Sequence, residues 1–342
     1  GHLEIIKWIV NKNRYLISDC DVYKQNCAIL ASINGYVDIL EYVDTIDSSL
    51  KFSTNAEGAS CCRLAVENGQ LEVLKWFKSK GVNVNSMFHD GTNSSIIAAR
   101  GGLIDIVNWL ITREDYPSHQ LNDCLLNAVN SQHIELAKHL VSNTKASLRA
   151  RDRRGSTCLL LAAYHGNFEL MSWLLSQGCS LSEKDNDGDT CLLLACYSGK
   201  IETIKWIISQ GALITERNDE GLSCILIAAK TDDIELAKWL LDNGASLDDR
   251  TNNLDTCLIV AARHGCLDMV KWLVNEKGRS LDEMNIFGTC IMNAALCQKL
   301  DVALWMLQNG STLEENLCLS KKNCEDILKD NGLYDILKQM YS

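Results

Sequence analysis

The sequence predicts an all-α protein built as a solenoid from one short repeated unit. Tryptophan, or a residue in its place, recurs every 30 to 34 residues along most of the chain. Cysteine keeps the same period, and a residue typical of helix N-termini precedes each member of that series. Units of about 33 residues are too short to bury a core alone, so they must stack on their neighbours.

The tryptophan series marks the second helix of each unit. Its members are Trp8, Tyr42, Trp76, Trp109, His139, Trp173, Trp206, Trp239, Trp272 and Trp305. An acid lies in the first turn of this helix in every unit, as Glu72 does three residues before Lys75. Because an acid at this place complements the helix dipole, we interpret these carboxylates as helix-stabilising and not as catalytic.

The cysteine series marks the first helix of each unit. Its members are Cys27, Cys61, Cys124, Cys158, Cys191, Cys224, Cys257, Cys290 and Cys324, with Ser94 in the single gap. The preceding caps are Asn26, Ser60, Asn93, Asp123, Thr157, Thr190, Ser223, Thr256, Thr289 and Asn323. We therefore expect a short helix to begin directly after each cap and to end at a glycine such as Gly166, Gly199 or Gly265.

The unit resembles the ankyrin repeat, and residues 188–218, "GDTCLLLACYSGKIETIKWIISQGALITERN", form a regular copy. The resemblance covers nearly the whole chain and implies about ten helix-turn-helix repeats after an N-terminal half repeat. Cysteine stands at the proline of the family signature. Apolar residues stand at its histidine, namely Leu160, Leu193, Leu226, Ile259 and Met292. We expect apolar packing between first helices to replace the hydrogen bonds of that histidine.

The repeats divide the chain into four stretches. Residues 1–110 hold N-terminal repeats and start inside a repeat, residues 111–152 hold a shortened repeat, and residues 153–316 hold regular repeats. Residues 317–342 form a capping repeat, because charged or polar residues take positions that are apolar elsewhere. These residues are Glu325, Asp326, Lys329 and Gln339.

The stretch 111–152 departs from the pattern in three ways. It holds the sole proline, Pro117, and it has Gln132 where glycine is usual and His139 where tryptophan is usual. Only 15 residues separate Trp109 from Cys124. We expect a shortened turn and a kink here, which would divide the chain into two partly independent folding units.

The 16 cysteines allow two interpretations. Neighbouring helices lie about 8 to 10 Å apart, whereas a disulfide requires Cα atoms within about 7 Å, and no CxxC spacing occurs. Buried packing is one interpretation. A redox or metal role is the other, because a helix N-terminus lowers the pKa of a thiol. So many unpaired thiols predict a reducing compartment, the cytoplasm or nucleus.

Composition and motifs exclude several classes of function. The net charge of −11 opposes binding to nucleic acid or anionic lipid, and no apolar run reaches the roughly 18 residues of a membrane helix. The sequence has no phosphate-binding glycine loop and no catalytic or metal-binding set at suitable spacing. We therefore expect no enzyme activity of the chain itself, no cofactor and no metal.

The resemblance implies a concave partner-binding surface at the turn tips and the inner ends of the first helices. The candidate residues are Arg151, Arg154, Tyr164, His165, Lys184, Tyr197, Arg217, Lys230, Arg250, Arg263 and His264. Aromatic and basic side chains together are typical of interface hot spots. We expect a monomer that binds an acidic, extended segment of a protein partner. In the alternative, Glu183, Glu216 and Asp249 pair with the bases between repeats.

Two functions remain open. The first is a protein-interaction module or scaffold without catalysis. The second is the substrate-recruiting arm of a larger enzyme, for example a ubiquitin ligase, a kinase or a secreted effector, whose catalytic domain lies outside this chain. Asn85 also matches the asparagine that can be hydroxylated in the ankyrin family.

Overall fold

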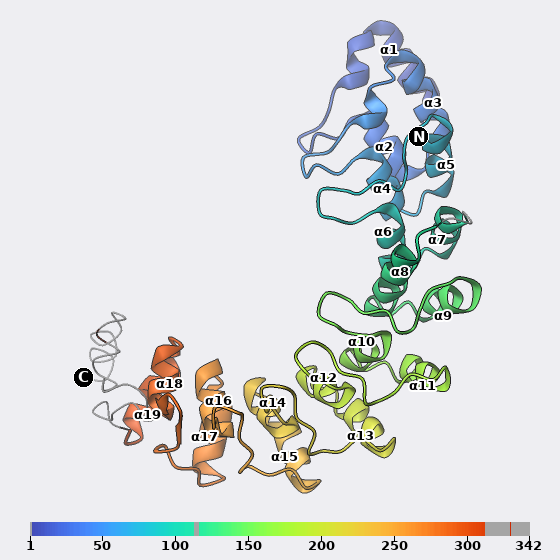
Figure 1. Ribbon diagram of the computed structural model, residues 1–342. Coiled ribbons are helices and arrows are strands. Elements are labelled where there is room, and N and C mark those ends of the chain that lie inside the picture. Colours follow the sequence, from blue (N-terminus) through green and yellow to red (C-terminus); the bar gives the residue numbers. More distant parts are fainter. Residues whose placement is uncertain (1, 113–115, 312–328, 330–342) are drawn as a thin grey trace. The chain divides into compact units, whose positions relative to one another are not determined.

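The computed structural model describes residues 2–112, 116–311 and 329 (Figure 1). The chain forms two compact units, unit 1 from Gly1–Ala150 and unit 2 from Arg151–Ser342. The capping repeat predicted at 317–342, with Cys324 and its cap Asn323, lies outside the described residues apart from Lys329.

In unit 1, first and second helices of successive repeats alternate along the chain. The elements are α1 (Leu3–Lys12), η1 (Arg14–Ser18), α2 (Cys27–Asn34), α3 (Val37–Ile46), η2 (Leu50–Phe52), α4 (Cys61–Glu67), α5 (Leu71–Ser79), α6 (Ser94–Arg100), α7 (Ile104–Ile111), α8 (Ser118–Asn130) and α9 (Ile134–Asn143). The first helices α2, α4, α6 and α8 pack side by side in that order, and each also contacts its own second helix.

Unit 2 repeats the same arrangement more regularly. Its elements are α10 (Cys158–His165), α11 (Phe168–Ser176), α12 (Cys191–Tyr197), α13 (Ile201–Ser209), α14 (Cys224–Lys230), α15 (Ile234–Asp242), α16 (Cys257–His264), α17 (Leu267–Asn275), β1 (Met284–Asn285), β2 (Gly288–Thr289), α18 (Cys290–Leu296) and α19 (Leu300–Gln308). The two short strands pair antiparallel in one turn. The predicted all-α repeat solenoid is confirmed.

The predicted caps begin most first helices. The Thr190 side chain, for example, accepts the backbone N–H of Leu193 at the start of α12. Ser223 and Thr289 occupy the N-cap position of α14 and α18, but their side chains make no capping hydrogen bond. Glycine ends α10 and α16 in the left-handed region, at Gly166 and Gly265.

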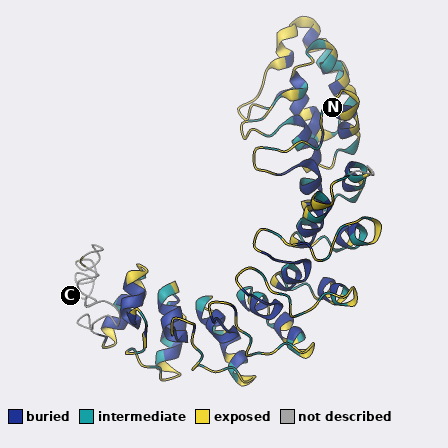
Figure 2. Ribbon diagram, viewed as in Figure 1, coloured by how far each residue is buried: buried dark blue, intermediate teal, exposed yellow. Residues whose placement is uncertain are grey.

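The core follows the first helices, which are dark blue along most of their length in Figure 2. The five apolar residues at the histidine position of the signature are at most 1% exposed. Burial of one such side chain contributes about 1.5 to 3 kcal/mol. Apolar packing therefore stands where the family signature has a histidine, as predicted.

The predicted start of the first helix at Asp123 and Cys124 is wrong. Helix α8 begins six residues before Cys124, at Ser118, directly after Pro117. The Pro117 carbonyl accepts the N–H groups of Gln120 and Leu121, and the early turn buries Leu121. Because proline fixes its own φ angle and needs no N–H partner, it starts the helix early and leaves Asp123 in the helix interior.

Candidate partner-binding surface

A recurrent turn before each regular first helix of unit 2 positions the basic residues. In each turn a side-chain oxygen accepts the backbone N–H groups two and four residues later. The residues that supply this oxygen are Asp152, Asp185, Asn218 and Thr251. Such side chains imitate a backbone turn. One signal of this turn is present in the sequence, since a polar residue directly follows each of the four predicted bases.

Two of the four predicted turn bases tie consecutive repeats together. The Arg217 guanidinium donates to the carbonyl oxygens of Gly221 at 3.1 Å and Arg250 at 3.0 Å. Arg151 makes the equivalent bonds to Gly155 and Lys184. These two arginines therefore have a structural role within unit 2, which the sequence analysis did not anticipate.

The other turn bases are freer. The Arg250 guanidinium has one hydrogen-bond partner among the residues that the structure describes, the Leu254 carbonyl oxygen at 3.4 Å. Lys184 and Arg154 are exposed, and their side chains have no hydrogen-bond or ion-pair partner in the part of the chain that the structure describes. These two cations are therefore available to a partner.

The acids that precede three of the bases bridge neighbouring repeats. In each case the cap hydroxyl of one repeat donates to the carboxylate of the next, as Thr190 does to Glu216 at 2.5 Å. We call these contacts the cap bridges; they are Thr157 to Glu183, Thr190 to Glu216, Ser223 to Asp249 and Thr256 to Glu283. Asp249 also pairs with Arg217 at 2.6 Å. Pairing between repeats is thus confirmed for Asp249, whereas Glu183 and Glu216 bind hydroxyl groups.

One repeat position at the inner end of the first helices carries Tyr164, Tyr197, Lys230 and Arg263, on α10, α12, α14 and α16. The Tyr164 side chain is 46% exposed. The Lys230 ammonium lies 5.2 Å from the centre of the Tyr197 ring, and Arg263 pairs with the Asp255 carboxylate at 2.9 Å. Aromatic and basic groups therefore follow one another along a single row.

The two predicted histidines have pKa values below the ordinary value of a histidine. Burial lowers the pKa of His165 and of His264, and nearby lysines lower both further. The His165 ring also meets the Tyr164 ring edge-on, with centroids 5.3 Å apart. The histidines therefore contribute shape and hydrogen bonds instead of steering charge.

Two buried carboxylates share another repeat position beneath the row. Asp255 is paired with Arg263 and also accepts a bond from the Asn285 amide. Within the described residues, the Asp189 carboxylate has one side-chain hydrogen-bond partner, the Asn218 amide at 2.9 Å, and the charge of Lys230 acts on it. Burial raises the pKa of Asp189 to about 6, and Asp185 and Asp187 add to the rise. The carboxylate oxygens of these three residues lie within 4.8 Å of one another.

The described cysteines of the series are buried, as the packing interpretation predicts, apart from Cys27, which is half-buried. Cys158, Cys191, Cys224 and Cys257 are at most 1% exposed. Burial raises the pKa of Cys158 and of Cys257 to about 12. The expected lowering by the helix N-terminus is thus overridden, and the reactive thiolate is disfavoured. The described cysteines are all free thiols.

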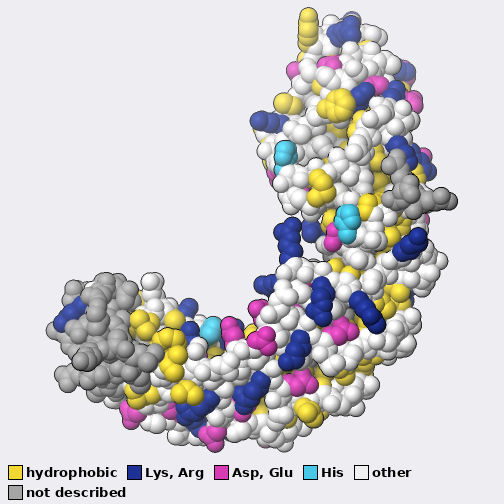
Figure 3. All heavy atoms as spheres, in the orientation of Figure 1, with side chains coloured by type: hydrophobic (Ala, Val, Ile, Leu, Met, Phe, Trp, Pro, Cys, Tyr) yellow, Lys and Arg dark blue, Asp and Glu magenta, His cyan; other side chains and the backbone are white. Residues whose placement is uncertain are grey.

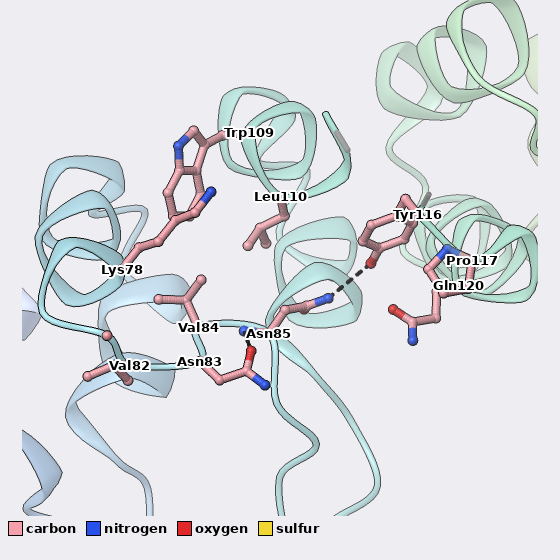
Figure 4. Close-up of a pocket in the computed structure, with 11 residues that line it drawn as sticks. Lys78, Val82, Asn83, Val84, Asn85, Trp109, Leu110, Tyr116, Pro117 and Gln120 are labelled. Carbon is pink, nitrogen blue, oxygen red and sulfur yellow. Dashed lines mark hydrogen bonds between the residues drawn. The ribbon is translucent and has the colours of Figure 1, made fainter. Parts of the chain in front are cut away.

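The irregular repeat of unit 1 uses a tyrosine where the cap bridges stand in unit 2. The Tyr116 hydroxyl donates to the Ser95 hydroxyl at 2.6 Å. It also accepts from the Asn85 amide at 3.2 Å (Figure 4). His139, in the usual tryptophan position, contacts the Asn108 side-chain oxygen at 2.6 Å. These polar contacts therefore accompany the packing of α8 against α6 and α9.

None of the described helices is long and apolar enough to cross a lipid bilayer.

Comparisons with known proteins agree with the repeat architecture. An ankyrin repeat and KH domain-containing protein of Caenorhabditis briggsae is 27% identical over 167 residues, which are 45% of this chain and 6% of that protein. A protein of Dirofilaria immitis named L-asparaginase is 28% identical over 189 residues, which are 48% of this chain and 32% of that protein. The chain thus spans a third or less of the length of these relatives. The family profile for three copies of the ankyrin repeat matches residues 125–218 and 225–317, together just over half of the chain. The chain therefore belongs to the ankyrin repeat family.

Proposed function

We propose that the chain captures a protein partner on unit 2, along the turn tips and first-helix ends from Arg151 to His264. Ankyrin repeats are generally protein-interaction modules and generally not catalytic. The observation that carries the proposal is the row of Tyr164, Tyr197, Lys230 and Arg263. Tyrosine and arginine supply large contact areas and directed hydrogen bonds, and both are enriched at interface hot spots.

The charges beside this row favour one orientation of the partner. The first two turns expose four bases, Arg151, Arg153, Arg154 and Lys184, and one acid, Asp187. The third exposes two acids, Asp219 and Glu220, and one base, Arg217. Figure 3 shows basic and acidic side chains interspersed over the face of unit 2 that it presents. An extended segment fits if its acidic residues lie over Arg154 and Lys184 and an apolar residue contacts Tyr164. The charges would steer association.

The test is a double change of the free cations, Lys184→Glu with Arg154→Glu. Peptides would first be selected on the purified chain from a phage-displayed library of random 12-residue peptides. We expect an acidic class that binds the double variant at least about tenfold more weakly and depends less on salt there. Arg217 is left intact, because its loss would break the turn itself.

A matched control changes two lysines on second helices, Lys205→Glu with Lys271→Glu. Net charge changes by the same amount, and only exposed ion pairs within α13 and α17 are lost. We expect these peptides to bind the control as they bind the unmodified chain. Equal binding of all acidic peptides to Lys184→Glu with Arg154→Glu would refute the proposed surface.

The second candidate is the recruiting arm of a larger enzyme. The similarity to a protein named L-asparaginase favours it. In that case the chain alone should release no ammonia from asparagine, whereas a parent protein with a catalytic domain should. Ammonia release by the purified chain would contradict both candidates.

We also propose that the chain is a monomer in the cytoplasm or nucleus, since its described thiols are free. Light scattering of the purified chain checks the oligomeric state.

A further inference from the structure

Unit 1 contains a pocket that the partner surface on unit 2 does not use. It has a volume of about 900 Å³ and is lined by residues of α5, α7 and α8 and by the segment 81–85. Figure 4 shows Lys78 beside Trp109 at one side and Gln120 with Pro117 at the other. This volume lies within the range of about 300 to 1,000 Å³ of ligand sites.

The pocket lies where the chain lacks a regular turn. In unit 2, 18 residues separate Trp206 from Cys224, and the intervening turn supplies the cap-bridge acid Glu216. Between Trp109 and Cys124 there are only 15. Here Tyr116 reaches Ser95, but the rest of the usual turn is replaced by the early start of α8. The pocket lies beside this shorter connection, whose Tyr116 and Pro117 line it.

Lys78 stands at a position of the second helices that is apolar in eight of the ten repeats. The residues two positions after the tryptophan marker elsewhere are Val10, Asp44, Ile111, Val141, Leu175, Ile208, Leu241, Val274 and Leu307. The one other charged member, Asp44, has two lysine partners. Lys78 has no acidic partner in the described part of the chain, and its ammonium lies 4.9 Å from the centre of the Trp109 ring. Its charge is therefore available at the edge of the pocket.

The remaining lining suits a peptide. Val82, Val84 and Leu110 are apolar, and the ring of Trp109 extends that surface. The Gln120 amide has no hydrogen-bond partner among the described residues, so it can bind a peptide backbone. Among the described residues that line the pocket, Lys78 is the one charged side chain.

We propose that this pocket binds an extended peptide segment of a partner protein that carries an Asp or Glu next to a large apolar residue. The carboxylate pairs with Lys78, the apolar side chain contacts Trp109 and Val84, and the Gln120 amide bonds the backbone. Tyr116, held by Ser95 and Asn85, forms a fixed wall. This second site is independent of the surface on unit 2.

The test uses the library of random 12-residue peptides on the full chain and titrates individual peptides by fluorescence polarisation. One class should pair an acid with a neighbouring apolar residue and should lose about tenfold or more in affinity on Lys78→Leu. Leucine is the residue of α11, α15 and α19 at this position, so the variant is expected to fold. Gln120→Ala should weaken the same peptides about threefold.

The matched control is Lys75→Leu, one turn earlier on α5. Lys75 pairs with Glu72 at 2.6 Å and does not line the pocket. Binding should stay within about twofold of the unmodified chain, and it should also persist in Lys184→Glu with Arg154→Glu. The proposal is overturned if no such peptide is selected, if Lys78→Leu binds the peptides unchanged, or if Lys75→Leu weakens them equally.

Discussion

Adjacent repeats are joined by different side-chain hydrogen bonds in the regular repeats of unit 2 and at the connection between α7 and α8 of unit 1. In unit 2 a turn delivers a carboxylate to the cap hydroxyl of the preceding repeat, as Glu216 does to Thr190. Between α7 and α8 the turn is shorter, and the Tyr116 hydroxyl reaches back to Ser95 instead. One side chain from the connection joins adjacent repeats in both regions.

The difference teaches that the turn both holds repeats together and fills the space between them. A tyrosine can replace the hydrogen bond, but it cannot replace the volume of the lost turn. The result is the pocket beside Lys78 and Gln120. Surface available for recognition therefore arises in two ways, at the tips of complete turns and in the gap left by an incomplete one.

The strongest test of this comparison is Tyr116→Ala. The change removes a half-buried ring and both of its hydrogen bonds, so we expect the free energy of unfolding to fall by about 3 to 5 kcal/mol. Tyr116→Phe keeps the ring and should cost about 1 to 2 kcal/mol. Urea unfolding followed by circular dichroism measures both.

Hydrogen exchange locates the effect. We expect protection to fall in α6 to α8 and to stay unchanged in α12 to α16, because solenoid contacts join only neighbours. The same measurement tests the predicted minimum of protection across residues 111–152. Uniform loss along the whole chain on Tyr116→Ala would show that the connection is not a local joint.

A second test compares the two buried carboxylates, Asp189 and Asp255, which occupy the same position in two regular repeats. The pKa of Asp189 is raised from 3.8 to about 6, so ionisation of this carboxyl destabilises the fold. The destabilisation is absent below about pH 4, grows as the pH rises and is complete above about pH 6. Asp189→Asn keeps an oxygen for the Asn218 amide. It should raise the free energy of unfolding at pH 7 by about 1 to 3 kcal/mol and leave it unchanged near pH 3.5.

Asp255→Asn is the matched change at the same repeat position. It breaks the pair with Arg263, so it should lower the free energy of unfolding at pH 7 by about 1 to 3 kcal/mol. Thermal unfolding between pH 3.5 and pH 7 distinguishes the two variants. The same sign for both would mean that Asp189 has a cation partner in solution.

The smallest expected change in the free energy of unfolding concerns the residue with left-handed backbone conformation that follows the first helix. Gln132 in the irregular repeat and Gln298 in the last described repeat have φ angles of 63° and 59°, at a position where most other repeats have glycine and one has Asp232. Gln132→Gly and Gln298→Gly should each raise the free energy of unfolding by about 0.5 to 1 kcal/mol. A gain only at Gln298 would indicate that the Gln132 side chain stabilises the irregular repeat.

The repeat, its two helices and the buried cysteine series could be predicted from the sequence, because the period, the caps and the apolar positions are local signals. The sequence did not predict the cap bridges or the role of Arg217, because those contacts join atoms of different repeats, about 26 to 33 residues apart. It placed the start of α8 too late, since the cap pattern at Asp123 competes with Pro117. The pocket was missed because it results from absent residues, which no motif marks.

The cap bridges also affect how a chain of this kind can gain repeats during evolution. Each repeat carries the hydroxyl for the next repeat and the carboxylate for the previous one, as Thr190 and Glu183 do in neighbouring positions of one unit. A gene duplication of one whole repeat therefore inserts a copy that fits on both sides without further change. A deletion of a few residues within a turn removes one half of a joint, and the chain must then acquire a substitute such as Tyr116.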